Sequence, residues 1–123
     1  MGQVIGKNIL HFSSYDHFIN EKILEFSNFT NIDFKINDSL NITDKFVGKN
    51  YGIPTNESLE SLKILGRYEG IILDPIYSGK AFAALISDIK SKQISDDESV
   101  LFIHTGGLFN IFQYNKEIHN YLI

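Results

Sequence analysis

The sequence predicts an α/β fold built on a short, mainly parallel sheet. Two short apolar runs, residues 71–73 and 100–103, flank an amphipathic run at residues 82–89. Strand, helix and strand at this spacing are typical of a right-handed βαβ unit. A polar turn follows each apolar run, at residues 74–81 and at 104–107. Because ligands of open α/β sheets bind where strands end and helices begin, we expect these two turns to form the site.

Composition and charge exclude several functional classes. The chain has 123 residues, of which 43% are hydrophobic and 21% charged, so it is expected to form a single domain over residues 1–123. A formal net charge of −4 disfavours nucleic acid and acidic membranes as partners. There is no cysteine, no apolar run of roughly 18 residues and no recognisable signal peptide. We therefore expect a cytoplasmic protein without disulfides or thiolate metal sites.

The first third of the chain predicts a strand, a helix and one or two further strands. Residues 3–6 have the pattern of a short buried strand. Ser13 or Ser14 can cap a helix that runs to about Asn28, and its apolar stripe follows a 3.6-residue period: Tyr15, Phe18, Ile19, Ile23 and Phe26. Residues 31–43 alternate loosely, which indicates one or two short edge strands broken by Asn37 and Asp38.

The middle of the chain predicts a constrained loop and a well-delimited helix. Two glycines and a proline in residues 47–54 indicate a loop with an unusual path. Thr55 or Asn56 can cap the helix that follows, Arg67 lies in its last turn, and Gly70 supplies a left-handed stop. Both ends therefore predict the same element.

The last part predicts the βαβ unit and a short helix. Residues 71–73 and 100–103 are the predicted buried strands, and residues 82–89 lie in the helix between them. Gly106 and Gly107 open a helix over residues 108–114, and residues 115–123 are weakly patterned.

Four hydroxyl-bearing side chains could line one pocket at the ends of the two predicted strands: Tyr77, Ser78, Thr105 and Tyr51. Each has a simpler interpretation when taken alone. Ser78 would be a plain helix cap, Lys80 a solvated charge and His104 a hydrogen-bonded structural group. The four histidines, at positions 11, 17, 104 and 119, do not have the spacing of metal ligands, so no metal site is expected.

Three segments in order carry a specific resemblance: NYGIPTNE at 50–57, EGIILDPIYSGKA at 69–81 and LFIHTGG at 101–107. Together they resemble the D-cysteine desulfhydrase and 1-aminocyclopropane-1-carboxylate deaminase family, which are pyridoxal-phosphate enzymes of the tryptophan-synthase-β fold type (fold type II). The resemblance runs from about Val4 to Tyr114. It implies a three-layer αβα arrangement and identifies the chain as the C-terminal part of such an enzyme's large domain.

The resemblance also implies roles for individual residues. Tyr77 matches the family tyrosine that lies over the cofactor and acts on the substrate, and Tyr51 matches a second active-site tyrosine. Thr105 matches the desulfhydrase threonine at the pyridine nitrogen, and Gly106 follows it in the cofactor-binding turn. Ser78 stands where deaminases have glutamate and desulfhydrases threonine. Departures from the family pattern are Phe109 and Asn110, in place of a small Pro-Ala pair, and Asn50, in place of a glycine.

These matches imply a truncated or split D-cysteine desulfhydrase-like lyase with pyridoxal 5'-phosphate as cofactor and a small amino acid as substrate. No stretch matches the family's lysine that binds the cofactor covalently, so the chain alone is expected to be inactive. A complementary N-terminal chain or a homo-oligomer would then complete it. The alternative is a non-catalytic remnant or interaction domain. A nucleotide-binding module is disfavoured, because no glycine-rich phosphate fingerprint follows the first predicted strand.

Overall fold

The computed structural model describes residues 4–7, 15–34 and 40–122. By its internal contacts the chain divides into two compact units, residues 1–44 and 45–123. Each unit is described by itself below. The prediction that residues 1–123 form one domain stays a prediction.

The first unit contains a parallel strand pair with a helix between the strands in sequence. Strand β1 (Val4–Lys7) pairs in parallel with β2 (Leu40–Thr43), with Val4 opposite Leu40 and Lys7 opposite Thr43. Helix α1 (Tyr15–Thr30) connects them, as parallel pairing requires a long crossover. The structure thus confirms the strand predicted near the start, the helix after it and a strand within residues 31–43. The predicted caps Ser13 and Ser14 lie outside the described residues.

Much of the apolar surface of α1 is exposed. Three of its large side chains keep about half of their surface accessible: Phe18 at 45%, Leu24 at 62% and Phe26 at 52%. The Phe26 ring packs on that of Phe34, with centroids 5.1 Å apart. The helix ends where the Thr30 hydroxyl donates to the Phe26 carbonyl at 2.8 Å and Asn31 turns to a φ of 54°. An apolar face of this kind is a candidate contact surface.

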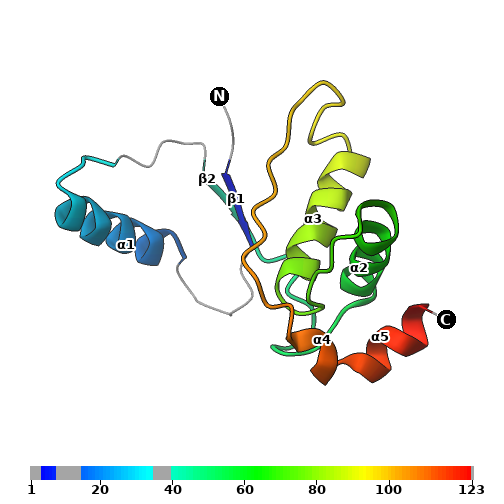
Figure 1. The fold of residues 1–123 in the computed structure, drawn as a ribbon. Helices are drawn as coiled ribbons and strands as arrows, with labels where there is room; N and C mark the ends of the chain where they lie inside the picture. The colour runs from blue at the N-terminus through cyan, green and yellow to red at the C-terminus, as the bar shows by residue number, and fades with distance from the viewer. Residues whose placement is uncertain (1–3, 8–14, 35–39, 123) are drawn as a thin grey trace. The chain divides into compact units, whose positions relative to one another are not determined.

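The second unit is organised around two helices, α2 (Asn56–Glu69) and α3 (Ser78–Lys90), which pack side by side (Figure 1). Small residues allow the two backbones to approach. A Cβ built on Gly79 would meet the Asp74 carbonyl oxygen at 2.5 Å and Leu62 Cδ1 at 2.7 Å, so only glycine fits there. The Ser61 hydroxyl crosses the contact and donates to the Gly79 carbonyl at 2.7 Å.

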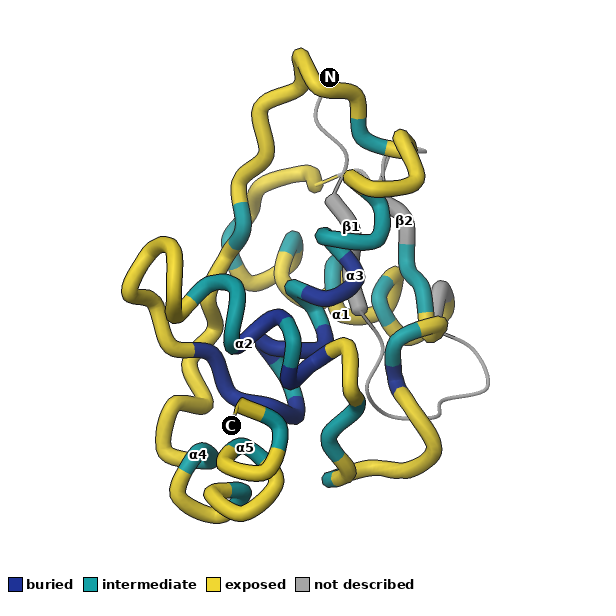
Figure 2. The backbone as a smooth tube through the Cα atoms, turned by 90° about the vertical axis from the view of Figure 1, so that its right-hand side faces the viewer, coloured by how far each residue is buried: buried dark blue, intermediate teal, exposed yellow. Residues whose placement is uncertain are grey.

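The core of this unit follows the same contact. The buried stretch runs through the turn before α3 and into its first half (Figure 2). The apolar core residues of the unit, from this stretch, α2 and the loop before α2, are Val47, Leu59, Leu62, Leu73, Ile76, Ala83 and Ala84. Helix α2 begins and ends as its sequence predicts. Thr55 and Ser58 form a reciprocal capping box, and Gly70 closes the helix in the left-handed conformation at a φ of 67°.

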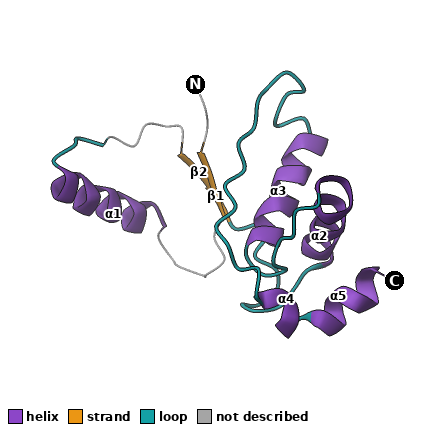
Figure 3. Ribbon diagram, in the orientation of Figure 1, coloured by secondary structure: helices purple, strands orange, loops and turns teal. Residues whose placement is uncertain are grey.

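The two strands predicted in this unit are absent, which corrects that part of the βαβ prediction. Residues 71–73 and 100–103 are extended segments without strand pairing, drawn as loops in Figure 3. A strand is defined by backbone hydrogen bonds to a neighbour, and neither segment has a neighbouring strand within residues 45–122. Several of their apolar side chains are accessible, with Ile72 52% exposed, Leu101 85% and Ile103 72%, whereas Leu73 is buried in the core.

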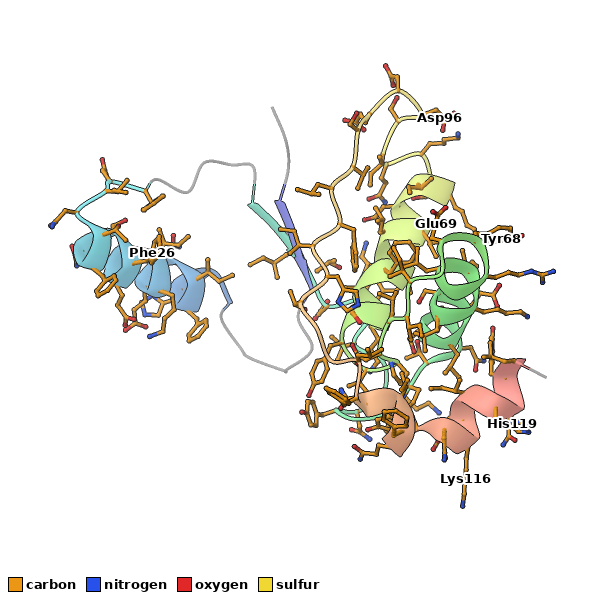
Figure 4. The ribbon with its side chains drawn as sticks, viewed as in Figure 1. Phe26, Tyr68, Glu69, Asp96, Lys116 and His119 are labelled. Carbon is orange, nitrogen blue, oxygen red and sulfur yellow. The ribbon has the colours of Figure 1, made fainter. Side chains whose placement is uncertain are left out.

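Two short helices complete the described chain. Helix α4 (Asn110–Gln113) lies within the helix predicted at residues 108–114. Helix α5 (Asn115–Leu122) follows it where only weak patterning was expected. The Tyr121 hydroxyl donates to Glu60 Oε2 at 3.2 Å, which holds α5 on α2. Figure 4 shows Lys116 and His119 projecting outward from α5.

Fold class is therefore confirmed only at the level of helices combined with a parallel strand pair. The two described strands form a single two-stranded sheet, and the three-layer arrangement stays a prediction. None of the described helices is long and apolar enough to cross a membrane.

Candidate active site at the start of α3

A buried carboxylate builds the turn that leads into α3. Asp74 is fully buried, and its Oδ1 accepts hydrogen bonds from the backbone N–H groups of Ile76 at 2.9 Å and Tyr77 at 2.7 Å. Its Oδ2 accepts from Ser78, both from the backbone N–H at 2.8 Å and from the hydroxyl at 2.6 Å. The carboxylate thereby satisfies the free N–H groups at the start of the helix.

The protonation of Asp74 follows from these contacts. Burial by itself raises the pKa of this carboxyl, but the hydrogen bonds from Ser78, Tyr77 and Ile76 outweigh burial and hold its pKa below the ordinary value. Asp74 is therefore an anion at neutral pH. Both of its oxygens are already used inside the turn.

Ser78 belongs to the same network. Only 3% of the residue is exposed, and its hydroxyl accepts a hydrogen bond from the Asp74 backbone N–H at 3.0 Å while it donates to Asp74 Oδ2. The side chain thus ties the two ends of the turn together. A direct contact from Ser78 to a cofactor would have to compete with these bonds.

The two predicted catalytic tyrosines come together. The hydroxyls of Tyr51 and Tyr77 share a short hydrogen bond, and their rings are tilted by 58° with centroids 6.1 Å apart. The hydrogen bond from Tyr51, then burial, then the charges of Tyr51 and Asp74 raise the pKa of Tyr77 to about 12. Tyr77 therefore keeps its phenolic proton at neutral pH. Tyr51 remains 58% exposed, so the pair is accessible from solvent.

The loop at residues 47–54 carries Tyr51 and is fixed at two points. Lys80 extends from α3 and donates from Nζ to the Val47 carbonyl at 2.7 Å. At the other end, the Tyr114 hydroxyl donates to the Gly52 carbonyl at 2.7 Å. Gly52 adopts a φ of 74°, a conformation that favours glycine.

Lys80 is a core residue, and its interpretation as a solvated charge is wrong. Only 2% of Lys80 is exposed. Burial lowers its pKa, and the Asp74 carboxylate partly opposes that effect. Its ammonium group is enclosed by the protein and hydrogen-bonded to the loop.

The second predicted turn lies against the first. A Cβ on Gly107, whose φ is 86°, would meet Asp74 Oδ2 at 2.8 Å, so glycine permits this approach. His104 bridges the segments: its Nδ1 accepts from the Gly106 N–H at 3.0 Å, which leaves Nε2–H to donate to the Ile72 carbonyl at 3.1 Å. The predicted structural role of His104 is thus what its contacts show. Thr105 and Gly106, between His104 and Gly107, are exposed.

The predicted site residues therefore fall into two neighbouring groups around Asp74. Tyr51 and Tyr77 form one, Thr105 and Gly106 belong to the turn that packs on Asp74, and Ser78 is hydrogen-bonded to Asp74 itself. The catalytic and cofactor-binding roles of these five residues stay predictions.

Sequence reasoning missed Asp74, Lys80 and Tyr114 as organisers of the site. The Asp-Pro pair before the helix was a usable signal for Asp74, because aspartate commonly caps such turns. The partners of Lys80 and Tyr114 lie 33 and 62 residues away in sequence, and no local pattern points to them.

Two open hollows lie elsewhere in this unit. One, of about 450 Å³, is lined by residues of the 52–54 loop, α2 and α5, and by Tyr114, which lies between α4 and α5. The other, of about 700 Å³, lies between α2 and α3 and includes Glu57, Glu60 and Lys90. Within residues 4–7, 15–34 and 40–122, no group of three or more His, Asp or Glu side chains could hold a metal ion.

Two comparisons with known proteins agree with the motifs. A family model described as "Pyridoxal-phosphate dependent enzyme" matches residues 30–106. A solved structure, described as the crystal structure analysis of an ACC deaminase homologue, matches with a TM-score of 0.81 and 28% sequence identity. That match covers 98% of this chain and 36% of the solved chain, so the chain spans about a third of that structure's length. The match supports an α/β fold of this type.

Proposed function

Because the chain belongs to the family of pyridoxal-phosphate dependent enzymes, we propose that it is part of a lyase of the D-cysteine desulfhydrase type. The reaction would convert D-cysteine and water to pyruvate, hydrogen sulfide and ammonia. The observation that carries this proposal is the Tyr51–Tyr77 hydroxyl pair, because it keeps Tyr77 protonated at the entrance to α3.

The exposed turn at residues 105–107 fits the noncovalent part of a cofactor site. Thr105 presents an accessible hydroxyl, and a Cβ on Gly106 would meet no atom within 4 Å, so this turn has open space beside it. When bound, pyridoxal phosphate supplies an electron-withdrawing ring to the substrate carbon. Thr105 would hold the pyridine nitrogen through a neutral hydroxyl.

The covalent link to the cofactor does not fit Lys80, the one lysine in the motif. Its ammonium group is buried and donates to the Val47 carbonyl, which leaves it no path to a carbonyl group outside the core. We therefore propose that the covalent lysine lies outside these motifs, in a part of the enzyme that residues 1–123 do not include. Treating the chain with pyridoxal phosphate and then borohydride should leave no site-specific lysine adduct, and an adduct on Lys80 would contradict this assignment.

Tyr77 is proposed as the proton donor of the site. A phenol with a pKa of about 12 is protonated at neutral pH and can release its proton only to a group that gains negative charge. The sulfur that leaves the substrate is such a group. Tyr51 would orient Tyr77 through the shared hydrogen bond and receive part of the charge that develops.

Selectivity is proposed to rest on the absence of a carboxylate at the ligand side of the site. Ser78 and Thr105 carry hydroxyls, and the nearby Asp74 spends both oxygens on hydrogen bonds within its turn. Without a carboxylate partner, the pyridine nitrogen has a lower pKa and is protonated less readily. That suits the loss of a good leaving group more than the opening of a cyclopropane ring.

The proposal is tested on a complex with a complementary N-terminal part, assayed for sulfide from D-cysteine and for ring opening of 1-aminocyclopropane-1-carboxylate. Tyr77→Phe should remove most turnover and leave cofactor binding nearly intact, because it deletes one hydroxyl and little volume. Thr105→Val should alter the cofactor's absorption, whereas Thr105→Ser keeps the hydroxyl and serves as the matched control. Efficient ring opening by the unmodified complex, or an unchanged turnover in Tyr77→Phe, would contradict the assignment.

A non-catalytic interaction domain is the second candidate. It is favoured by the exposed apolar segments, of which Leu101 at 85% and Ile103 at 72% are the most accessible. The two candidates differ in one result. An interaction domain would bind the complementary chain or a second copy of itself, and the assembled complex would release no sulfide.

A further inference from the structure

Tyr114 connects the C-terminal helices to the loop that carries Tyr51. It stands between α4 and α5, where its carbonyl accepts the Ile118 N–H at 3.0 Å. Its hydroxyl reaches across to the Gly52 carbonyl at 2.7 Å. The residue is only partly exposed, so this hydrogen bond is sheltered from water.

Apart from the Lys80 contact at Val47 and the hydroxyl contact of Tyr51, the loop around Gly52 is weakly held. Its internal backbone hydrogen bond, from the Ile53 N–H to the Asn50 carbonyl, is long at 3.4 Å. Ile53 is 46% exposed and Tyr51 is 58% exposed, so packing against the core is slight. On one side the loop borders the hollow of about 450 Å³, which leaves it room to shift.

The position of Tyr51 depends on this loop. Tyr51 immediately precedes Gly52, so a rotation about the Gly52 backbone would move the Tyr51 hydroxyl away from Tyr77. Gly52 at a φ of 74° is free to adopt other conformations unless its carbonyl is held. The Tyr114 hydroxyl is the side-chain donor that the structure gives to that carbonyl.

We propose that Tyr114 is a positioning residue, whose hydrogen bond to the Gly52 carbonyl fixes the loop so that the Tyr51 hydroxyl meets the Tyr77 hydroxyl. The inference rests on the proposed function only for its catalytic consequence; the geometric part concerns this chain alone. It also gives α4 and α5 a role at the site, since they place Tyr114. The charge of Tyr114 adds, as the smallest of the contributions, to the raised pKa of Tyr77.

The test uses the full chain with ring-labelled tyrosine and the conservative variant Tyr114→Phe, which removes one hydroxyl. At neutral pH, the nuclear Overhauser contact between the Tyr51 and Tyr77 rings should be present in the wild type and lost in the variant. At pH 11, a phenol with a pKa of about 12 is about one-tenth ionised, whereas one with an ordinary pKa near 10 is about nine-tenths ionised. Tyr114→Phe should therefore raise the ionised fraction of Tyr77 several-fold.

Tyr68→Phe is the matched control, since Tyr68 is 74% exposed at the end of α2, where Figure 4 labels it, and should leave both signals unchanged. Helix content by circular dichroism checks that each variant is folded. A wild-type ring contact that survives in folded Tyr114→Phe overturns the positioning role and leaves the proposed function standing. A wild type without the ring contact overturns both this role and the tyrosine pair on which the proposed function rests.

Discussion

Replacing Asp74 by asparagine should lower the free energy of unfolding by about 3 kcal/mol at neutral pH. This magnitude follows from the hydrogen bonds that the carboxylate accepts. One oxygen of the amide can keep accepting from Ile76 and Tyr77, as Oδ1 does now. The amide NH₂ would face the Ser78 N–H in place of Oδ2, which now accepts at 2.8 Å. The change removes a charge-assisted bond and leaves a buried N–H without an acceptor, and each such loss costs roughly 1–3 kcal/mol.

The pH dependence supplies a second signature of the same carboxylate. The pKa of Asp74 is lower in the folded chain than its ordinary value of 3.8. Its stabilising contribution is therefore complete above that ordinary value and is lost as the pH falls through the lower folded value. The difference between wild type and Asp74→Asn should be largest near neutral pH and should shrink as the pH falls below about 4.

The assay is urea unfolding of the full chain, followed by circular dichroism of the helices at several pH values. Asp96→Asn makes the same chemical change at an exposed carboxylate, whose partner Lys92 lies 2.6 Å away with both side chains mostly in solvent. That control should cost well under about 1 kcal/mol. A loss below about 1 kcal/mol for Asp74→Asn, or a difference that does not change with pH, would refute the proposed role of the carboxylate.

Three further predictions concern the packing around the site. Gly79→Ala should cost more than about 3 kcal/mol in urea unfolding, because its Cβ would lie 2.5 Å from the Asp74 carbonyl oxygen; Gly66→Ala, inside α2 with its nearest atom at 3.9 Å, should be neutral or stabilising. Because burial lowers the folded pKa of Lys80 below its ordinary 10.5, wild-type stability should gain as the pH rises toward that value. The gain should be missing in Lys80→Met, and the same pH dependence of stability in wild type and Lys80→Met below 10.5 would argue against a buried ammonium. Finally, the exposed apolar side chains at 71–72 and 100–103 should make the chain self-associate, and a dilution-stable monomer in sedimentation would count against the proposed missing partner.

The elements predicted best from sequence are those whose signals are local. Helix α2 carries both its cap at Thr55 and its stop at Gly70 within the chain segment that forms it, and both ends are confirmed. Helix α5 was not predicted although Tyr114, Ile118 and Tyr121 recur at nearly helical spacing, because so short a helix gives the apolar pattern little length in which to repeat. The segments at 71–73 and 100–103 have strand composition, but composition does not supply the neighbour that a strand requires.

For the candidate site too, the sequence predicts what depends on local signals and does not predict contacts between distant residues. The sequence could indicate that two polar turns meet, since each follows an apolar run, and the approach of Gly107 to Asp74 bears out that convergence. It could not indicate that Lys80 points inward, because a lysine in a first helical turn is usually solvated and its acceptor, the Val47 carbonyl, belongs to a distant loop. The carboxylate and the ammonium are thus enclosed, whereas the predicted hydroxyl groups of Tyr51, Tyr77 and Thr105 keep some exposure. In the proposed function these neutral hydroxyls donate protons, and the basic amine that binds the cofactor covalently has to come from outside this site.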